Sequence, residues 1–232
     1  MITAKFKDQL EAASKLIEIL PKKELVDKKT IVVCMSLESV ILTDAVCRSL
    51  NLSYEMLFSE PIPAPNNSEC DVAIVSETED IVLNDKLIKA FNISYDYIYG
   101  EAHRKYEEKI LKNVYKYRKG NLIGELKDKN ILLIDEGCET GMTALICIKT
   151  LLDVKVKSIS YATPVIATDV FTNLNDMVDE IYTINKIVDF IDVDSYYEKK
   201  IEATSERIMS ILEESPHYLP LQKQQGDKNN AI

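Results

Sequence analysis

Two neighbouring acids, Asp135 and Glu136, directly follow the apolar run ILLI at residues 131–134. Carboxylates placed side by side accept hydrogen bonds from vicinal hydroxyl groups, or help to hold a hydrated Mg²⁺. The branched apolar residues before them predict a buried strand. Because ligands of open parallel sheets sit at the carboxyl ends of the strands, the two acids mark a candidate binding site.

A turn of small and hydroxylic residues, GCETGMT (137–143), follows the acids and leads into an apolar helix pattern. Unpaired amides and the helix dipole at such an N-terminus favour an anion. Gly141 allows the backbone to approach a ligand closely, and Thr140 and Thr143 add hydroxyl donors. The constellation suits a sugar phosphate, with amides and hydroxyls for the phosphate and carboxylates for the ribose.

These features also have simpler interpretations. Asp135 and Glu136 could merely cap the following helix, since acids favour helix N-termini. Arg118 and Lys119 could likewise only favour the C-terminus of the helix before Gly120. Another α/β phosphate-binding fold, such as a flavodoxin-like one, shares the strand–loop–helix logic but gives no reason for the paired acids.

Apolar runs that alternate with helical patterns organise the rest of the chain. The sequence predicts strands at 30–35, 53–58, 70–77, 130–135, 157–165 and 178–185, and helices at 6–20, 39–52, 84–93, 99–121, 141–153 and 195–215. The proline-rich stretch 60–69 is expected to form a loop, and the alternating Tyr95, Tyr97 and Tyr99 are typical of a half-buried strand.

This alternation of strands and helices predicts the fold class. We expect an α/β protein with an open, mainly parallel, twisted sheet and helices on both faces. The pattern contains no internal repeat and no low-complexity linker, so it indicates one domain over residues 1–214. The polar segment 215–232, with two prolines, is predicted to be a flexible C-terminal tail.

Composition restricts the class of function. The 232 residues carry a formal net charge of −10, which offers no broad cationic surface to nucleic acid or to an anionic membrane. No apolar run approaches the roughly 18 residues that cross a bilayer, and the charged start predicts a cytoplasmic protein. The five cysteines are scattered without a CxxC pair, so we expect reduced thiols rather than a disulfide framework or a zinc site.

The pattern of four apolar residues, two acids and x-x-x-Thr-Gly-x-Thr resembles the ribose-phosphate loop of type I phosphoribosyltransferases. Weaker similarity extends to FKDQLEAASKLIEIL, PAPNNSE, YRKGN and DFIDVDSYYEKKIEATSERIMSIL. The resemblance implies the Rossmann-like fold of that family and often a homodimer. It also implies transfer of phosphoribosyl from 5-phosphoribosyl 1-pyrophosphate (PRPP) to a nucleobase or other acceptor, in nucleotide salvage, with Mg²⁺ held mainly by the substrate.

The resemblance also assigns roles to single residues. Asp135 and Glu136 would be the catalytic acids that hold the ribose hydroxyls. The loop that wraps the 5-phosphate would be Glu139, Thr140, Gly141, Met142 and Thr143. The residues on the pyrophosphate side would be Ser36, Leu37, Arg104, Arg118 and Lys119, the last three as cations that close over pyrophosphate from a mobile segment.

One part of the family pattern is missing. Where members usually carry a Pro-Arg-Gly-Gly type of turn for pyrophosphate, this chain has Ser36, Leu37, Glu38 and Ser39. Losing cations and gaining carboxylates weakens PRPP binding, since each charge-assisted contact contributes about 1.5–3 kcal/mol. Two hypotheses therefore stay open: a Mg²⁺-dependent phosphoribosyltransferase, and a catalytically degenerate member that binds a nucleotide or ribose phosphate.

Overall fold

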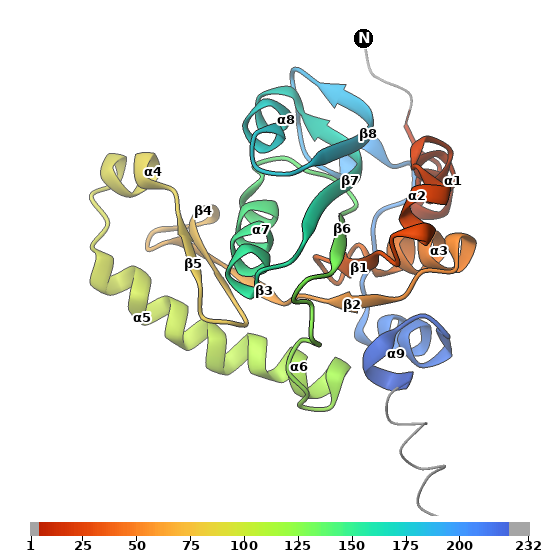
Figure 1. The fold of residues 1–232 in the computed structure, drawn as a ribbon. Helices are drawn as coiled ribbons and strands as arrows, with labels where there is room; N and C mark the ends of the chain where they lie inside the picture. Colours follow the sequence, from red (N-terminus) through yellow and green to blue (C-terminus); the bar gives the residue numbers. More distant parts are fainter. Residues whose placement is uncertain (1–4, 223–232) are drawn as a thin grey trace, which may run out of the picture.

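A five-stranded parallel sheet forms the centre of the protein in the computed structural model, which describes residues 5–222 (Figure 1). The strands lie in the order β2-β1-β6-β7-β8, and every neighbouring pair is parallel. Their bounds are Ile31–Cys34 (β1), Tyr54–Met56 (β2), Asn130–Ile134 (β6), Ser158–Ala167 (β7) and Glu180–Ile187 (β8). The predicted α/β class with a parallel sheet is confirmed.

Both faces of this sheet are buried, because successive side chains of a strand point to opposite sides. Val32 and Leu132 belong to a core cluster shared with α1 and α3, whereas Val33 and Leu133 belong to a second cluster shared with α7 and α8. Figure 1 shows the two helix layers on opposite sides of the sheet. These helices are α1 (Gln9–Ile19), α3 (Val40–Leu50), α7 (Met142–Val154) and α8 (Thr168–Asn175).

Two further helices extend the layer of α1 and α3. Helix α2 (Lys22–Asp27) follows α1, and α9 (Ser205–Glu214) packs on α3. The predicted closing helix 195–215 is therefore wrong in its first half, because Thr204 caps the helix N-terminus by accepting a hydrogen bond from the amide of Arg207. Within residues 5–222, no helix is both long and apolar enough to span a membrane.

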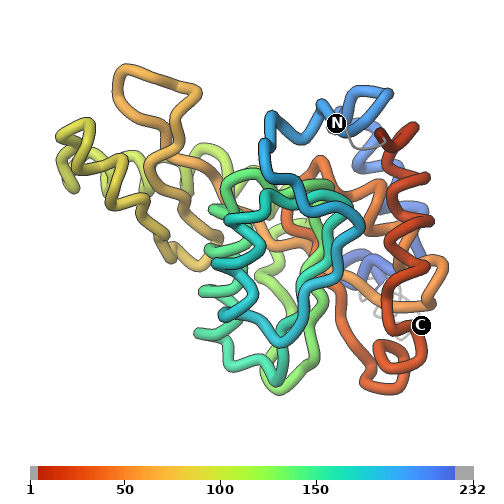
Figure 2. The backbone as a smooth tube through the Cα atoms, turned by 90° about the horizontal axis from the view of Figure 1, so that it is seen from above, coloured from red at the N-terminus to blue at the C-terminus, as the bar shows by residue number. Residues whose placement is uncertain are grey.

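The segment 59–118, here called the arm, projects from the carboxyl-end side of the central sheet (Figures 1 and 2). It contains the antiparallel sheet β3-β4-β5, the helix α4, and the long helix α5–α6 with a π-helical turn at Tyr106–Ile110. The bounds are Ser59–Ala64 (β3), Asn67–Ser76 (β4), Ile81–Leu83 (β5), Asp85–Ala90 (α4), Tyr95–Lys105 (α5) and Leu111–Arg118 (α6). The predicted strand at 70–77 thus exists, but it lies outside the parallel sheet.

Two predictions about the arm are wrong. The stretch 60–69 is a β-hairpin rather than a loop, because Pro61 and Pro63 lie on the edge strand β3, where a missing N–H donor is tolerated. The tyrosines at 95–99 are helical rather than extended. The hydroxyl of Ser94 accepts a hydrogen bond from the amide of Tyr97 and begins α5 there.

The first part of the predicted flexible tail, residues 215–222, packs against the rest of the chain. Tyr218 is fully buried, and its hydroxyl donates a 3.1 Å hydrogen bond to the carbonyl oxygen of Tyr117. The amide of Tyr54 on β2 donates to the carbonyl oxygen of His217 at 2.8 Å, so this segment lies against an edge of the central sheet. The remainder of the predicted tail, 223–232, lies outside the described residues.

Candidate functional site

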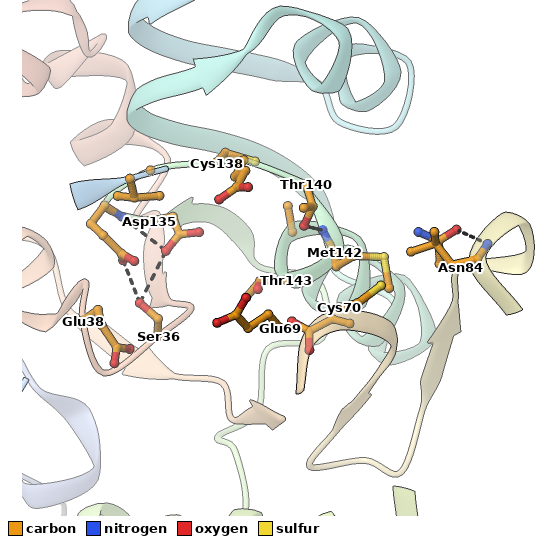
Figure 3. Close-up of a pocket in the computed structure, with 18 residues that line it drawn as sticks. Ser36, Glu38, Glu69, Cys70, Asn84, Asp135, Cys138, Thr140, Met142 and Thr143 are labelled. Atoms are coloured by element: carbon orange, nitrogen blue, oxygen red, sulfur yellow. Dashed lines mark hydrogen bonds between the residues drawn. The ribbon is translucent and has the colours of Figure 1, made fainter. Parts of the chain in front are cut away.

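A cavity of about 510 Å³ lies at the carboxyl ends of β1 and β6 (Figure 3). Its walls come from the turn after β1, from the segment 135–141 between β6 and α7, here called the acid loop, and from the arm. All seven residues that the sequence predicts for ribose and phosphate line it: Asp135, Glu136, Glu139, Thr140, Gly141, Met142 and Thr143. The structure therefore brings these residues together around one space.

The two acids are held in place by main-chain and hydroxyl donors. The amide of Asp135 donates to the carbonyl oxygen of Ala162 on β7 at 3.2 Å, and the amide of Glu136 donates to Asp135 Oδ1 at 3.2 Å. The hydroxyl of Ser36 contacts both carboxyls, at 2.8 Å from Glu136 Oε2 and 3.4 Å from Asp135 Oδ1. In Figure 3 Ser36 lies below Asp135, and dashed lines mark the hydrogen bonds of its hydroxyl.

Burial changes the protonation of this pair. Asp135 is only 6% exposed, and burial together with the adjacent Glu136 carboxyl raises the pKa of Asp135 well above its usual value. Burial also raises the pKa of Glu136, while hydrogen bonds from Asp135, from its own amide and from Ser36 act in the opposite direction. A pair of this kind retains a proton at a pH where ordinary carboxyls are ionised.

The rest of the acid loop forms a cradle that is clipped to β7. The amide of Cys138 donates to the carbonyl of Val165 at 2.9 Å, and the amide of Ala167 donates back to the carbonyl of Cys138 at 2.9 Å. Gly141, with φ +74, turns the chain into α7, which begins at Met142. The amide of Met142, the first residue of this 13-residue helix, donates to Thr140 Oγ1 at 3.4 Å, and both residues line the cavity (Figure 3).

A segment far along the chain covers the acid loop. Residues 188–198, here called the cover, bring Val193 onto Gly137, where an added Cβ would lie 2.6 Å from Val193 Cγ1. The hydroxyl of Tyr197 donates a 2.7 Å hydrogen bond to the carbonyl oxygen of Glu136. Only glycine fits beneath this cover, which explains the small residue between the acids and the turn.

The cavity wall is strongly acidic. Besides the acid pair it contains the carboxylates of Glu38, Glu69, Asp71 and Glu139, and no lysine, arginine or histidine of residues 5–222 lines it. Burial raises the pKa of Glu139, and the nearby carboxylate of Asp192 in the cover adds to the rise. A ligand phosphate here would be held by amides and hydroxyls rather than by a cationic side chain.

A second cavity of about 370 Å³ adjoins the first and shares Ser36, Glu38 and Thr143 with it. This cavity lies where the predicted pyrophosphate turn meets the arm. Its further walls include Leu37, Phe58, Glu60, Pro61 and Asn113. Burial raises the pKa of Glu60, which Lys105 and Lys109 on the arm lower and Glu38 raises further.

The three predicted pyrophosphate cations line neither cavity in the part of the chain that the structure describes. Arg118 is fully buried, pairs with the equally buried Glu77 and lies over the ring of Phe58. Arg104 forms ion pairs along its own helix with Glu101 and Glu108.

Lys119 is an exposed residue in the left-handed conformation that ends α6. In this structure Arg104 and Arg118 have intramolecular partners and Lys119 ends a helix, so the closing of these residues over a ligand stays a prediction. Of the predicted pyrophosphate turn, Ser36 lines both cavities and Leu37 lines the second.

Sequence reasoning missed the wall that the arm supplies. Glu69, Cys70 and Asp71 on β4 and Asn84 before α4 line the first cavity opposite the acid loop (Figure 3). Their distance in sequence from residue 135 conceals the contact. The local signal was the polar run at 66–69 after the prolines, which is typical of a surface turn.

The side chains present do not form a metal cage. Among residues 5–222, no group of three or more histidine, cysteine, aspartate or glutamate side chains is placed to hold a metal ion.

The parallel sheet, the acid loop after its central strand and the cover together form an α/β fold that a solved structure shares. TT1426 from Thermus thermophilus is a solved structure similar to this chain, with 24% identity, a TM-score of 0.73, and 91% of this chain and 99% of that chain covered. No family model matches the chain, and no curated protein matches it. At this identity the likeness to TT1426 concerns the fold.

More distant structures are described as enzymes. A purine phosphoribosyltransferase from Pyrococcus horikoshii matches at 12% identity and TM-score 0.42, over 78% of this chain and 93% of that chain. A hypoxanthine phosphoribosyltransferase from Trypanosoma cruzi, complexed with the product IMP, matches at 9% identity and TM-score 0.45, over 86% of each chain. Overlaps of this extent leave the activity of the present chain to be argued from its own site.

Proposed function

We propose that the cavity beside the acid loop binds the ribose 5-phosphate moiety of PRPP or of a nucleotide. The observation that carries this proposal is that Asp135 and Glu136 line the same cavity as the N-terminal turn of α7. Carboxyl groups that face a cavity bind vicinal hydroxyls, and helix N-terminal amides bind an anion. The groups for hydroxyls and the groups for an anion lie side by side, as binding of a ribose and its 5-phosphate requires.

In this proposal each part of the acid loop and of the first turn of α7 has one task. Asp135 and Glu136 bind the two ribose hydroxyls, and Thr140 and Thr143 donate hydroxyl hydrogen bonds to the phosphate. The amides of 139–143 provide the remaining donors, helped by Gly141, which lets the backbone approach. Glu139, at the exposed rim of the loop, points its charge away from the phosphate when the ligand is bound.

The reaction class that this site supports is phosphoribosyl transfer. With PRPP bound, a nucleobase or other acceptor would displace pyrophosphate, and positioning together with charge stabilisation would lower the barrier. Mg²⁺ on the pyrophosphate would supply the positive charge that the wall lacks. The test is pyrophosphate release from PRPP with Mg²⁺ and a panel of bases, compared with the variant Asp135→Asn/Glu136→Gln. Release that does not exceed this variant rejects transfer.

A second candidate is a protein that binds a nucleotide without chemistry. The carboxylates of Glu38, Glu60 and Asp71 around the second cavity favour it, because they repel a pyrophosphate group. Calorimetry separates the two candidates. Tight binding of a nucleoside 5′-monophosphate, together with weak binding of PRPP in the presence of Mg²⁺, supports the binding protein. Comparable binding of PRPP supports the transferase.

A further inference from the structure

The hydroxyl of Ser36 is held in a fixed orientation by its own turn. The amide of Ser39 donates to Ser36 Oγ at 2.9 Å, while the hydroxyl of Ser39 donates to the carbonyl oxygen of Ser36 at 3.1 Å. A serine oxygen that accepts from an amide has one proton left to donate. That proton can go to only one acceptor at a time.

The geometry decides which carboxyl receives this proton. Ser36 Oγ lies 2.8 Å from Glu136 Oε2 but 3.4 Å from Asp135 Oδ1, and the shorter distance is that of a strong hydrogen bond. Asp135 Oδ1 already accepts from the amide of Glu136. Because Asp135 is buried beside Glu136, a second ionised carboxylate there would face an adjacent charge with little solvent.

We propose that Ser36 is a positioning residue that divides the acid pair: its hydroxyl, oriented by the Ser39 amide, makes Glu136 the ionised acceptor and leaves Asp135 as the protonated donor. The turn at residues 36–39, which in the resembled family would bind pyrophosphate, here orients the hydroxyl that binds the acid pair. A protonated Asp135 donates to one hydroxyl oxygen of a diol, while Glu136 accepts the proton of the other. The ligand class is a vicinal diol bound in one orientation.

Several other titratable side chains lie near Asp135 and Glu136 and could influence their protonation. The carboxylate of Glu38, two residues after Ser36, raises the pKa of Glu136. Cysteine thiols and tyrosine hydroxyls surround the rest, and burial keeps them neutral because it raises the pKa of each: Cys34, Cys138, Cys147, Tyr161 and Tyr197. The charge outside the pair that raises the pKa of Glu136 is thus the negative Glu38, while hydrogen bonds from Asp135, from the amide of Glu136 and from Ser36 lower it.

Infrared spectroscopy of the ligand-free protein tests the division directly. The carbonyl stretch of a protonated carboxyl is separate from the carboxylate stretch, so spectra along a pH titration report each acid. We expect a protonated-carboxyl band at neutral pH that Asp135→Asn removes. Glu136→Gln should retain a band from Asp135 but lower its midpoint, because the adjacent charge is lost while burial remains. A band that instead survives in Asp135→Asn and disappears in Glu136→Gln overturns the proposal, as does the lack of any such band in the wild type.

The role of Ser36 is tested by three substitutions in the same titration. Ser36→Ala should raise the midpoint of the band assigned to Glu136 by about one pH unit or more, because a charge-assisted hydrogen bond is lost. Ser36→Thr should restore the midpoint. Ser39→Ala, which removes the other hydroxyl of the turn but keeps the amide, should leave it unchanged. An unchanged midpoint in Ser36→Ala, or an equal rise in Ser39→Ala, overturns the positioning role.

A second experiment connects the protonation states of Asp135 and Glu136 to the proposed function, on which the orientation of the diol rests. Binding of ribose 5-phosphate is measured from weakly acid to neutral pH in the wild type and in Ser36→Ala. As the pH is lowered, affinity should begin to decline at a higher pH in Ser36→Ala than in the wild type. The reason is that Glu136 must be ionised to accept the hydrogen bond of the ligand. A pH-independent loss in Ser36→Ala contradicts the proposal. Absence of ribose 5-phosphate binding would refute the proposed function alone, because the infrared result requires no ligand.

Discussion

The hydroxyl of Tyr197 and the carbonyl oxygen of Glu136 are joined by a hydrogen bond of 2.7 Å, although 61 residues separate them in sequence. Tyr197 is buried, and its ring lies 5.6 Å from that of Phe6, so the tyrosine is fixed from behind. The N-terminal segment, the cover and the acid loop therefore form one connected unit. The position of the acid pair depends on residues that do not line the cavity.

Tyr197→Phe removes this hydrogen bond while keeping the ring. We expect affinity for a ribose 5-phosphate ligand to decrease about two- to tenfold, the range that a net hydrogen-bond contribution of about 0.5–1.5 kcal/mol gives. Titration calorimetry measures the change. Tyr196→Phe is the matched control, because its hydroxyl contacts the amide of Ile191 within the cover. Equal losses in both variants would argue against a specific role of Tyr197.

Gly137 is the second contact between the cover and the acid loop. In Gly137→Ala the new Cβ would lie 2.6 Å from Val193 Cγ1 and 3.1 Å from Val165 Cγ2, so the cover must move. We expect a destabilisation of about 1–3 kcal/mol and weaker ligand binding. Gly137→Ala combined with Val193→Ala should recover part of both losses. Wild-type stability and binding in Gly137→Ala alone would show that the cover does not press on the loop.

A helical glycine provides the comparison for that variant. Gly100 lies inside α5, and a methyl group added there would meet no atom within 4 Å. Gly100→Ala should therefore stabilise the protein, by about 0.5–1 kcal/mol, through helix propensity. Urea unfolding measures both variants under the same conditions.

Arg118 and Glu77 form an ion pair whose side chains are 0% and 2% exposed. Arg118→Met leaves the carboxylate of Glu77 buried without this partner, and we expect a loss of about 3–5 kcal/mol in the free energy of unfolding. The double variant Arg118→Met/Glu77→Met should lose less than the single one. Arg104→Ala, at an exposed pair, should have little effect. A double variant as unstable as the sum of the single variants would contradict this account.

Asp135 gives a pH dependence whose sign follows from its raised pKa. A carboxyl whose pKa is raised in the folded protein binds its proton more tightly there than in the unfolded chain. Its contribution to stability is complete below the unfolded pKa of about 3.9 and is lost as pH rises through the folded pKa. As the pH rises above the unfolded pKa of about 3.9, Asp135→Asn should therefore lose less stability than the wild type.

Unfolding free energies at several pH values check this prediction. Asp80→Asn is a suitable control, because Asp80 lies at the surface in an ion pair with Lys149. If the wild type and Asp135→Asn decline in parallel, Asp135 is ionised in the folded protein.

The site could be predicted where its residues are contiguous. The strand, the two acids, the turn and the helix occupy one stretch of chain, so periodicity and the chemistry of helix N-termini locate them together. Local sequence also predicts most of the parallel sheet, since its strands are buried on both faces and contain apolar runs.

The parts that sequence did not reveal depend on partners far along the chain. From the sequence alone, Arg118 is expected to be an exposed cation. Its burial is explained by its contact with Glu77, 41 residues earlier. Pro61 and Pro63 indicate a loop until β4 pairs with them as an edge strand. The pairing of Tyr197 with Glu136 is likewise a long-range contact, for which a single sequence carries no local signal.

Titration calorimetry with ribose 5-phosphate, a nucleoside 5′-monophosphate and PRPP with Mg²⁺ tests the central claim most directly. The proteins compared are the wild type, Asp135→Asn/Glu136→Gln and a control, Glu79→Gln, whose side chain lines neither cavity. We predict that the wild type and the control bind at least one of these ligands equally well. The double variant should bind it at least about tenfold more weakly, as loss of charge-assisted hydrogen bonds requires. If no ligand binds the wild type, or if the double variant binds as the wild type does, the claim is contradicted.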